Sequence, residues 1–297
     1  MPAVKSAASP ATTRRAWLIG AGALWATPVA WATPNSRIIS IGGALTETLY
    51  ALGAQGELVG VDTTSLFPEA ARQLPSVGYA RALSAEGVLS LRPTLVVATQ
   101  EAGPPTVLRQ IESARAPLVL LDADHRFEGV LARTQRLAAL CGRVDAGRAL
   151  VADLQRGWAQ VQDQAARRAA AGQPAPRVLF VLSHSMAQVR VSGSGTSADA
   201  MLRYAGAVNV LGSVDGYKPL TPEAAIAAAP DVILATEQGL QAAGGINGLL
   251  KAPGLAQTPA GRTRRVVALD ALLLLGFGPR LPQAVAALAD ALHSKAA

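Results

Sequence analysis

The chain has 297 residues, enough for one large domain or two of ordinary size. Half of the residues are hydrophobic and only 4% are aromatic, so a sizeable core built mainly from Ala, Leu and Val can form. The formal net charge is +7, but no dense Lys/Arg stripe with interleaved aromatic residues occurs, which argues against nucleic-acid binding.

The first 32 residues have the features of an export signal. Thr13-Arg14-Arg15 precedes an apolar run, residues 16–30, which is short for a membrane span and ends at a small-x-small cleavage site. We predict that the signal peptide is removed after Ala32 and that the mature protein is periplasmic. The arginine pair resembles a twin-arginine signal, but ordinary secretory signals also begin with basic residues, so both export routes stay open.

A first α/β unit follows the signal. Arg37–Ile41 is a short apolar stretch typical of a buried strand, and Gly42-Gly43 turns the chain. Leu45–Leu52 has helical spacing and is stopped by Gly53, after which Leu58–Val61 resembles a second strand. Strands that alternate with helices predict a parallel sheet covered on both faces.

The stretch from Ser76 to Thr99 carries the most informative polar residues. Tyr79 follows a glycine and lies two residues before Arg81. Glu86 stands near the start of a short amphipathic helix, which Pro93 ends before the next buried strand begins. A phenol, a guanidinium and a carboxylate are thus close together in the sequence.

A long helical tract without proline, Phe127–Ala171, comes next. Its apolar residues have helical spacing, and Cys141-Gly142 is a point at which the helix can break. A helix of about 25 residues spans about 37 Å, enough to cross from one lobe to another. Such a stiff connector predicts limited lobe motion. Cys141, the only cysteine, lies in an apolar pattern and is interpreted as a small core residue.

A second α/β unit resembles the first. Val178–Leu182 is a predicted strand, and Ser197–Ala205 is a predicted helix stopped by Gly206. The chain ends with a strand at Arg265–Leu269 and a helix from about Leu281 to His293. The predicted fold class is therefore α/β, with mainly parallel sheets in two similar lobes, one long interlobe helix and a ligand cleft between the lobes.

An internal repeat supports the two lobes. Ser84–Thr99 aligns without gaps on Thr221–Thr236, and the alignment places Glu86 on Glu223. Each lobe then contains one helix-then-strand unit with an exposed acid, and only the first lobe has the tyrosine. The predicted segments are the signal peptide 1–32, the N-terminal lobe 33–125, the connector 126–173 and the C-terminal lobe 174–297.

The sequence offers no constellation for catalysis. It lacks a P-loop motif, and Ser192-Gly193-Ser194-Gly195 is a glycine-rich turn but not a nucleophile elbow. The three histidines, His125, His184 and His293, are far apart and form no pair with metal-ligand spacing. We therefore expect a binding protein that is not an enzyme.

Tyr79 has two readings from the residues alone. It can be a half-buried loop tyrosine beside an interlobe cleft. It can also be a phenolate ligand, because ferric iron stabilises the phenolate anion and Arg81 could add charge and hydrogen bonds. The residues leave both readings open.

Five segments resemble one protein family. They are VGYARALSAEGVLSLRPTLVVAT, RIISIGGALTETLYALGA, SGSGTSADAMLRYAGAVNV, TPEAAIAAAPDVILAT and GFGPRLPQAV. Over essentially the whole mature chain they resemble the periplasmic haem-binding proteins of bacterial haem ABC importers. That family belongs to the helical-backbone class of binding proteins, which also carries cobalamin and siderophores. The glycine-tyrosine-x-arginine step is the part that looks specific to haem.

The resemblance implies a role for several residues. Tyr79 would be the axial ligand of the haem iron, and Arg81 would assist it. Some members use a histidine from the second lobe, sometimes with two stacked haems, and His184 is the candidate here, although it could equally be a strand-end residue facing solvent. Glu86 and Glu223 would dock on the membrane permease, and both can also act simply as acids at helix N-termini.

The resemblance also implies a function and its partners. The chain would capture haem in the interlobe cleft and deliver it to the permease dimer of an ABC importer with its cytoplasmic ATPase, downstream of an outer-membrane haem receptor system. Haem would be a transported ligand and not a catalytic cofactor. The protein is expected to be monomeric, with Arg190 and Arg280 as candidate residues at the cleft rim. The alternative is the same scaffold carrying a ferric siderophore or a corrinoid.

Overall fold

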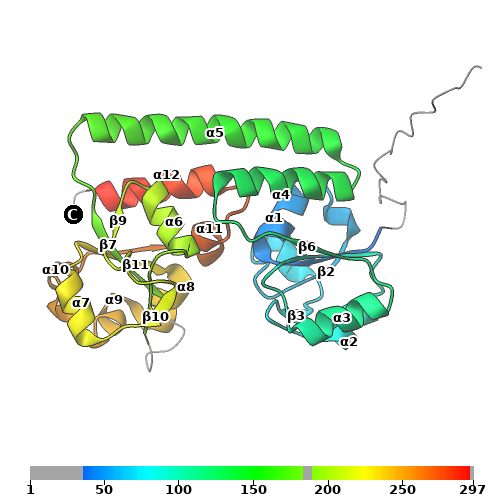
Figure 1. Cartoon of the computed structure of the whole chain (residues 1–297), viewed down its shortest axis with the longest axis horizontal. Coiled ribbons are helices and arrows are strands. Elements are labelled where there is room, and N and C mark those ends of the chain that lie inside the picture. Colours follow the sequence, from blue (N-terminus) through cyan, green and yellow to red (C-terminus); the bar gives the residue numbers. More distant parts are fainter. Residues whose placement is uncertain (1–35, 183–188, 295–297) are drawn as a thin grey trace, which may run out of the picture.

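The computed structural model describes residues 36–182 and 189–294, which form two α/β lobes beneath a layer of long helices (Figure 1). The sheet of the N-terminal lobe is entirely parallel and has the order β2-β1-β5-β6. Its strands are β1 (Ile38–Ile41), β2 (Leu58–Val61), β5 (Leu95–Thr99) and β6 (Leu118–Leu121). The expected parallel sheet is confirmed in this lobe.

Both faces of this sheet are buried, and its central strands β1 and β5 are apolar apart from Ser40 and Thr99. Ile38 and Leu95 point to one side, where α1 (Gly43–Ala51) and α4 (Phe127–Leu140) cover them. Ile39 and Val96 point to the other side, toward α2 (Ala85–Ser90), α3 (Pro105–Ser113) and the short hairpin of β3 (Gly78–Tyr79) and β4 (Ala82–Leu83). A nearly continuous apolar run of this kind is typical of a strand in a sheet covered on both faces.

The C-terminal lobe repeats this plan with an addition. β7 (Arg177–Leu182), β11 (Val232–Thr236) and β12 (Val266–Leu269) are parallel, and β9 (Val208–Asn209) joins β7 in the same sense. β8 (Arg190–Ser192) pairs antiparallel with the end of β7, on the side away from β11 where β9 also pairs, and β10 (Tyr217–Pro219) pairs antiparallel with β8. The expectation of mainly parallel sheets is therefore met, and the antiparallel edge is a feature that strand-helix alternation did not indicate.

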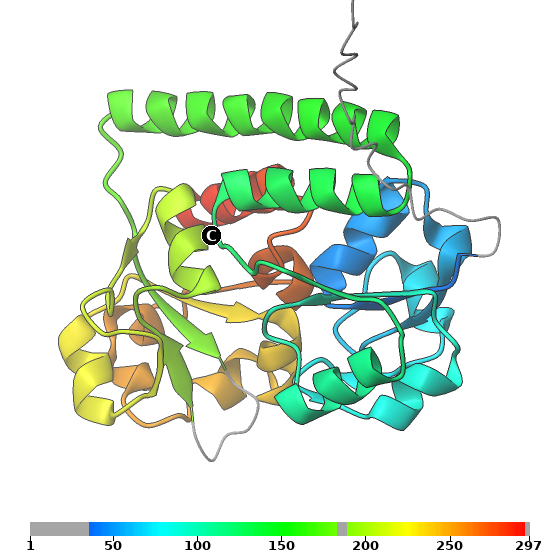
Figure 2. The same ribbon diagram turned by 45° about the vertical axis from the view of Figure 1, so that its right-hand side comes forward.

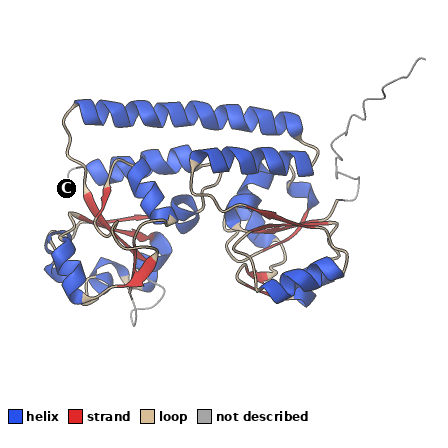
Figure 3. Cartoon of the chain, viewed as in Figure 1, coloured by secondary structure: helices blue, strands red, loops and turns tan. Residues whose placement is uncertain are grey.

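Short helices cover this second sheet on both sides (Figure 3). One side packs on α6 (Ser197–Tyr204), α11 (Ala271–Leu275) and α12 (Leu281–His293). The other packs on α7 (Pro222–Ala228) and α9 (Gly245–Leu249). The remaining short elements are η1 (Gln55–Glu57), η2 (Glu69–Gln73), α8 (Glu237–Ala242), η3 (Leu255–Gln257) and α10 (Pro259–Arg262).

The long helical tract forms two antiparallel helices, α4 and α5 (Val144–Ala170), separated at the expected break. Gly142 adopts a φ of 65°, the left-handed conformation that commonly terminates a helix. Phe127 at the start of α4 packs in the C-terminal core, whereas Leu137 packs in the N-terminal core. α5 has 27 residues, or about 40 Å, and runs back across both lobes (Figures 1 and 2). Both helices therefore bridge the lobes.

The internal repeat holds in the backbone as well as in the sequence. Ser84 and Thr221 cap the N-termini of α2 and α7, and each helix leads to a central strand of its sheet, β5 or β11. Arg92 and Ala229 occupy matching positions and have positive φ values of 46° and 42°, each followed by a proline. The two units consequently end their helices in the same way.

Within residues 36–182 and 189–294, no helix is both long enough and apolar enough to cross a membrane.

Candidate functional site

Tyr79 lies on a two-stranded hairpin at the N-terminal lobe. Gly78 pairs with Leu83 and Tyr79 pairs with Ala82, and the turn between the strands contains Arg81. Val77 and Leu83 are buried in the core, but 47% of Tyr79 is exposed. The apolar residues of the hairpin thus anchor it in the core, and the side chain of Tyr79 is left partly exposed.

The loops that follow two parallel strands, β2 and β5, form backbone hydrogen bonds to this hairpin. After β2, Thr63 donates its backbone N–H to the Gly78 carbonyl at 3.0 Å. After β5, Gly103 donates to the Ala80 carbonyl and accepts from the Leu83 N–H, both at 2.9 Å. Ligands of α/β folds bind at this end of the strands, and the backbone fixes Tyr79 there.

A buried carboxylate organises the loop after β2. Asp62 is 2% exposed and accepts hydrogen bonds from the Gly42 and Thr64 N–H groups and from the Thr64 and Ser65 hydroxyls. This loop carries Thr63, which holds the hairpin. Asp62 therefore supports Tyr79 from a distance, through backbone geometry.

Arg81 forms an ion pair with Glu101, with 2.5 Å between Nη2 and Oε2. The hydrogen bond to Glu101 raises the pKa of Arg81, and Tyr79 and Tyr217 add smaller contributions of the same sign. Tyr217 belongs to β10 in the C-terminal lobe, so the charge of Arg81 is influenced from both lobes. Glu101 was not among the residues selected from the sequence, because its loop has no distinctive pattern.

His125 lies near this pair, just before α4. Its ring packs against Phe277 with 5.2 Å between the ring centroids. Burial lowers the pKa of His125, and the negative charge of Glu101 partly opposes this shift. This shift favours the neutral form of His125, whereas Arg81 is the cation paired with Glu101.

Two arginines make contacts that join the lobes. Arg280 donates from Nε and Nη2 to the carboxylate of Glu47 on α1, at 2.8 and 2.9 Å, and its guanidinium lies 3.7 Å above the Phe67 ring. Arg133 on α4 is buried and donates to carbonyls on both sides of the junction, including that of Phe277 at 2.6 Å. Arg280, a candidate rim residue in the sequence, thus has an interlobe ion pair as its main contact.

The two repeat-related acids occupy equivalent exposed positions. Glu86 lies in the first turn of α2, and Glu223 lies in the first turn of α7. Both helices are at the ends of their lobes away from α5 (Figure 1). The structure therefore presents one carboxylate per lobe on the side of the molecule opposite the long helix.

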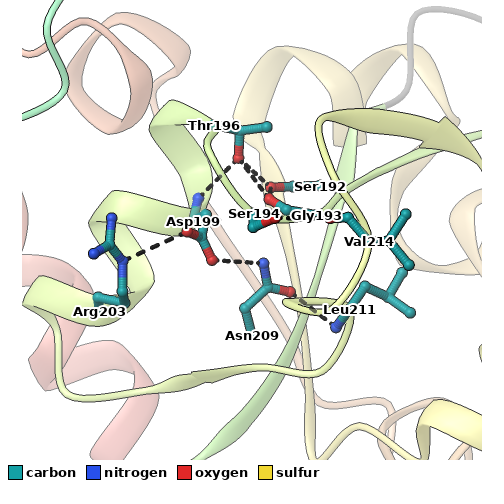
Figure 4. Close-up of polar contacts among 9 residues, drawn as sticks. All are labelled: Ser192, Gly193, Ser194, Thr196, Asp199, Arg203, Asn209, Leu211 and Val214. Carbon is teal, nitrogen blue, oxygen red and sulfur yellow. Dashed lines mark hydrogen bonds and ion pairs between the residues drawn. The ribbon is translucent and has the colours of Figure 1, made fainter.

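The glycine-rich turn of the C-terminal lobe is fully engaged in local structure (Figure 4). A side chain at Gly193 would meet the Val214 carbonyl at 1.8 Å, so this close backbone approach requires glycine. Thr196 caps α6 by accepting from the Asp199 N–H at 3.1 Å, and Asp199 accepts from Asn209 at 2.9 Å. These contacts give the turn a structural role.

The remaining features that the sequence singled out are His184, a possible metal site and Cys141. His184 lies outside the described residues. In the part of the chain that the structure describes, no cluster of three or more His, Cys, Asp or Glu side chains could hold a metal ion. A hollow of about 420 Å³ lies between α5 and α12, and its lining includes neither Tyr79 nor Arg81. Cys141 is buried, as expected, which raises the pKa of its thiol to about 12.

Comparison with known proteins identifies the family. Residues 38–273 match the periplasmic binding protein family, and the chain belongs to it. Two similar sequences are an uncharacterised ABC transporter substrate-binding lipoprotein, YvrC, from Bacillus subtilis and a vitamin B12-binding protein from Pectobacterium atrosepticum. The first is 24% identical over 86% of this chain and 80% of its own length. The second is 29% identical over 56% of this chain and 57% of its own length.

Solved structures add more similar proteins. The periplasmic haem-binding protein BhuT, in complex with two haems, is 52% identical with a TM-score of 0.82, covering 86% of this chain and 97% of its own. The periplasmic haem-binding protein RhuT from Roseiflexus, in its apo form, is 41% identical with a TM-score of 0.83, covering 87% and 98%. The family and these neighbours are binding proteins, which agrees with a role in capture and not in catalysis.

Proposed function

We propose that this chain is a periplasmic binding protein that captures haem between its lobes and delivers it to an ABC importer. The observation that carries the proposal is the exposed phenol of Tyr79 on a hairpin braced by two strand-end loops, in a chain that is 52% identical to a haem-binding protein. Haem is here the transported ligand, and no bond is made or broken within it.

Tyr79 is the proposed axial ligand of the ferric haem iron. Phenolate oxygen is a hard donor suited to ferric iron, and the positive charge of Arg81 nearby favours the anion. The apolar ring of haem would pack on aliphatic side chains of the two lobes. Arg81 supports the ligand from the same hairpin, two residues away.

A second haem ligand remains a separate proposal. His184 follows β7 in the C-terminal lobe and is the candidate for the opposite face of the iron or for a second haem. BhuT holds two haems in its complex, so either arrangement is compatible with this family. Substitution of His184 alone, with haem spectra recorded beside the wild type, would separate a ligand from a solvent-facing residue.

Export and assembly complete the proposal. Residues 1–32 would be a signal peptide cleaved after Ala32, by the twin-arginine or the general route. The mature protein would act as a monomer that docks with Glu86 and Glu223 on a permease dimer carrying a cytoplasmic ATPase. An outer-membrane haem receptor system would supply the haem.

The proposal is tested by titrating the mature protein, from Thr33, with ferric haem while absorption spectra are recorded. We expect saturable binding with a high-spin, phenolate-type spectrum that Tyr79→Phe abolishes. Binding that Tyr79→Phe leaves unchanged would preserve the haem function but reject the ligand assignment. Absence of saturable binding by the wild type would reject the haem function itself.

A corrinoid or ferric siderophore is the second candidate, favoured by the relative that binds vitamin B12. The metal in such a ligand is already coordinated and needs no protein phenolate. Tyr79→Phe should therefore have little effect on the binding of cyanocobalamin or a ferric siderophore, and direct titration with these compounds distinguishes the two ligand classes.

A further inference from the structure

We infer that Glu101 is a positioning residue that holds Arg81 beside Tyr79 and so sets the strength of the iron–phenolate bond. This inference rests on the proposed haem function. It goes beyond it by assigning a role to a carboxylate that lies on a different loop from the tyrosine and the arginine.

The backbone, and not only the ion pair, keeps Glu101 and Arg81 together. Two hydrogen bonds join the loop after β5 to the hairpin, from Gly103 to Ala80 and from Leu83 to Gly103. Glu101 lies two residues before Gly103 on this loop. The carboxylate is thus built into the same unit as the guanidinium, at a fixed separation that allows their 2.5 Å contact.

Because both side chains of the Arg81–Glu101 ion pair are exposed, the pair contributes little to the stability of the fold. The side chain of Arg81 is 58% exposed and that of Glu101 is 48% exposed. Ion pairs this open contribute little to stability because water screens them. Among the described residues each of the two side chains has no other hydrogen-bond partner, so neither is part of a larger structural network.

The pair would become important when a ligand covers it. An apolar ring excludes water, and both the attraction and the directional hydrogen bond are then stronger. An unpaired arginine would sample many rotamers, whereas Glu101 occupies one Nη2 proton and leaves other N–H groups free to donate to the phenolate oxygen. Outer partners of metal ligands typically change metal affinity by about 10- to 100-fold when they are removed.

Ferric haem titrations of Glu101→Ala, Arg81→Ala and the double variant test this inference. We expect Glu101→Ala to weaken binding about tenfold and to shift the phenolate-to-iron charge-transfer band. When Arg81 is already alanine, Glu101→Ala should cause no further loss of haem affinity, because Glu101 acts through Arg81. Glu101→Gln retains an acceptor for Arg81 and should fall between the wild type and Glu101→Ala.

Two controls keep the result interpretable. Glu112→Ala removes an exposed glutamate from α3 and should leave both the haem affinity and the spectrum unchanged. The thermal unfolding midpoints of the other variants should equal that of Glu112→Ala. No effect of Glu101→Ala, or an equal loss in both backgrounds, overturns the positioning role. Tyr79→Phe in the same series tests the proposed function separately, because its spectrum reports the ligand whatever Glu101 does.

Discussion

At the residue scale, the hairpin that carries Tyr79 is supported by a buried carboxylate that lies outside the hairpin. Asp62 receives four hydrogen bonds from the segment that turns out of β2 and from the start of α1. The next residue, Thr63, holds the hairpin of Tyr79 through Gly78. The backbone position of Tyr79 is therefore supported by a series of hydrogen bonds that begins at a buried carboxylate.

Replacement of Asp62 by alanine should destabilise the ligand-free protein by about 2–4 kcal/mol. The substitution leaves several buried donors without an acceptor, and each such group carries a desolvation cost. Urea unfolding measures the change. Asp145→Ala, at a side chain that is 90% exposed on α5, is the matched control and should remain within about 0.5 kcal/mol of the wild type. A similar small effect for Asp62→Ala would show that water replaces the carboxylate.

At the element scale, the repeat-related helices α2 and α7 connect fold to function. Each begins with a capping hydroxyl, carries an acid in its first turn and leads to a central strand. An acid at a helix N-terminus is favourable by itself, which would explain a single example. Two of them on the same side of the molecule also suit a two-fold symmetric partner.

Glu86→Ala combined with Glu223→Ala should impair haem delivery and leave haem binding intact. The proposed docking acids lie in the first turns of α2 and α7, outside the hairpin that carries Tyr79. Stimulation of ATPase activity in the reconstituted importer measures docking, and haem titration measures binding. Glu128→Ala alters an exposed first-turn acid on α4, on the bridging-helix side, and should leave both unchanged. Full stimulation by the double variant would reject the docking role.

Local patterns predicted the elements better than their pairing. The last helix begins and ends at Leu281 and His293 as predicted, because apolar spacing and the flanking loop are local signals. The antiparallel strands β8 and β10 are three residues each and lie at a sheet edge, where alternation of strand and helix carries no information. The chain reverses between α4 and α5 at Gly142. The sequence predicted the break at this glycine, but it did not predict that the second helix runs antiparallel to the first.

At the scale of the whole molecule, the residues most difficult to predict are those that meet from distant parts of the chain. Tyr79 and Arg81 were accessible because they are neighbours in a recognisable segment. Glu101 is 20 residues from Arg81, and Glu47 is 233 residues from Arg280. No spacing rule connects such pairs, and only the folded arrangement of two lobes brings them together.

The Glu47–Arg280 pair should be a principal determinant of how the lobes are held together. The side chains of Glu47 and Arg280 are 5% and 22% exposed, and two hydrogen bonds join them across the junction. Arg280→Ala leaves a buried carboxylate unpaired, so we expect a loss of about 3–5 kcal/mol in urea unfolding of the ligand-free protein.

Two further variants separate charge burial from packing at this junction. Glu47→Met together with Arg280→Met should recover most of the loss, because apolar side chains of similar volume carry no desolvation cost. Arg148→Ala removes one partner of an ion pair on α5 whose side chains are 74% and 90% exposed, and it should change stability by less than about 0.5 kcal/mol. If Arg280→Ala destabilised the protein no more than Arg148→Ala does, we would conclude that water reaches Glu47. The bridging helices alone would then hold the lobes together.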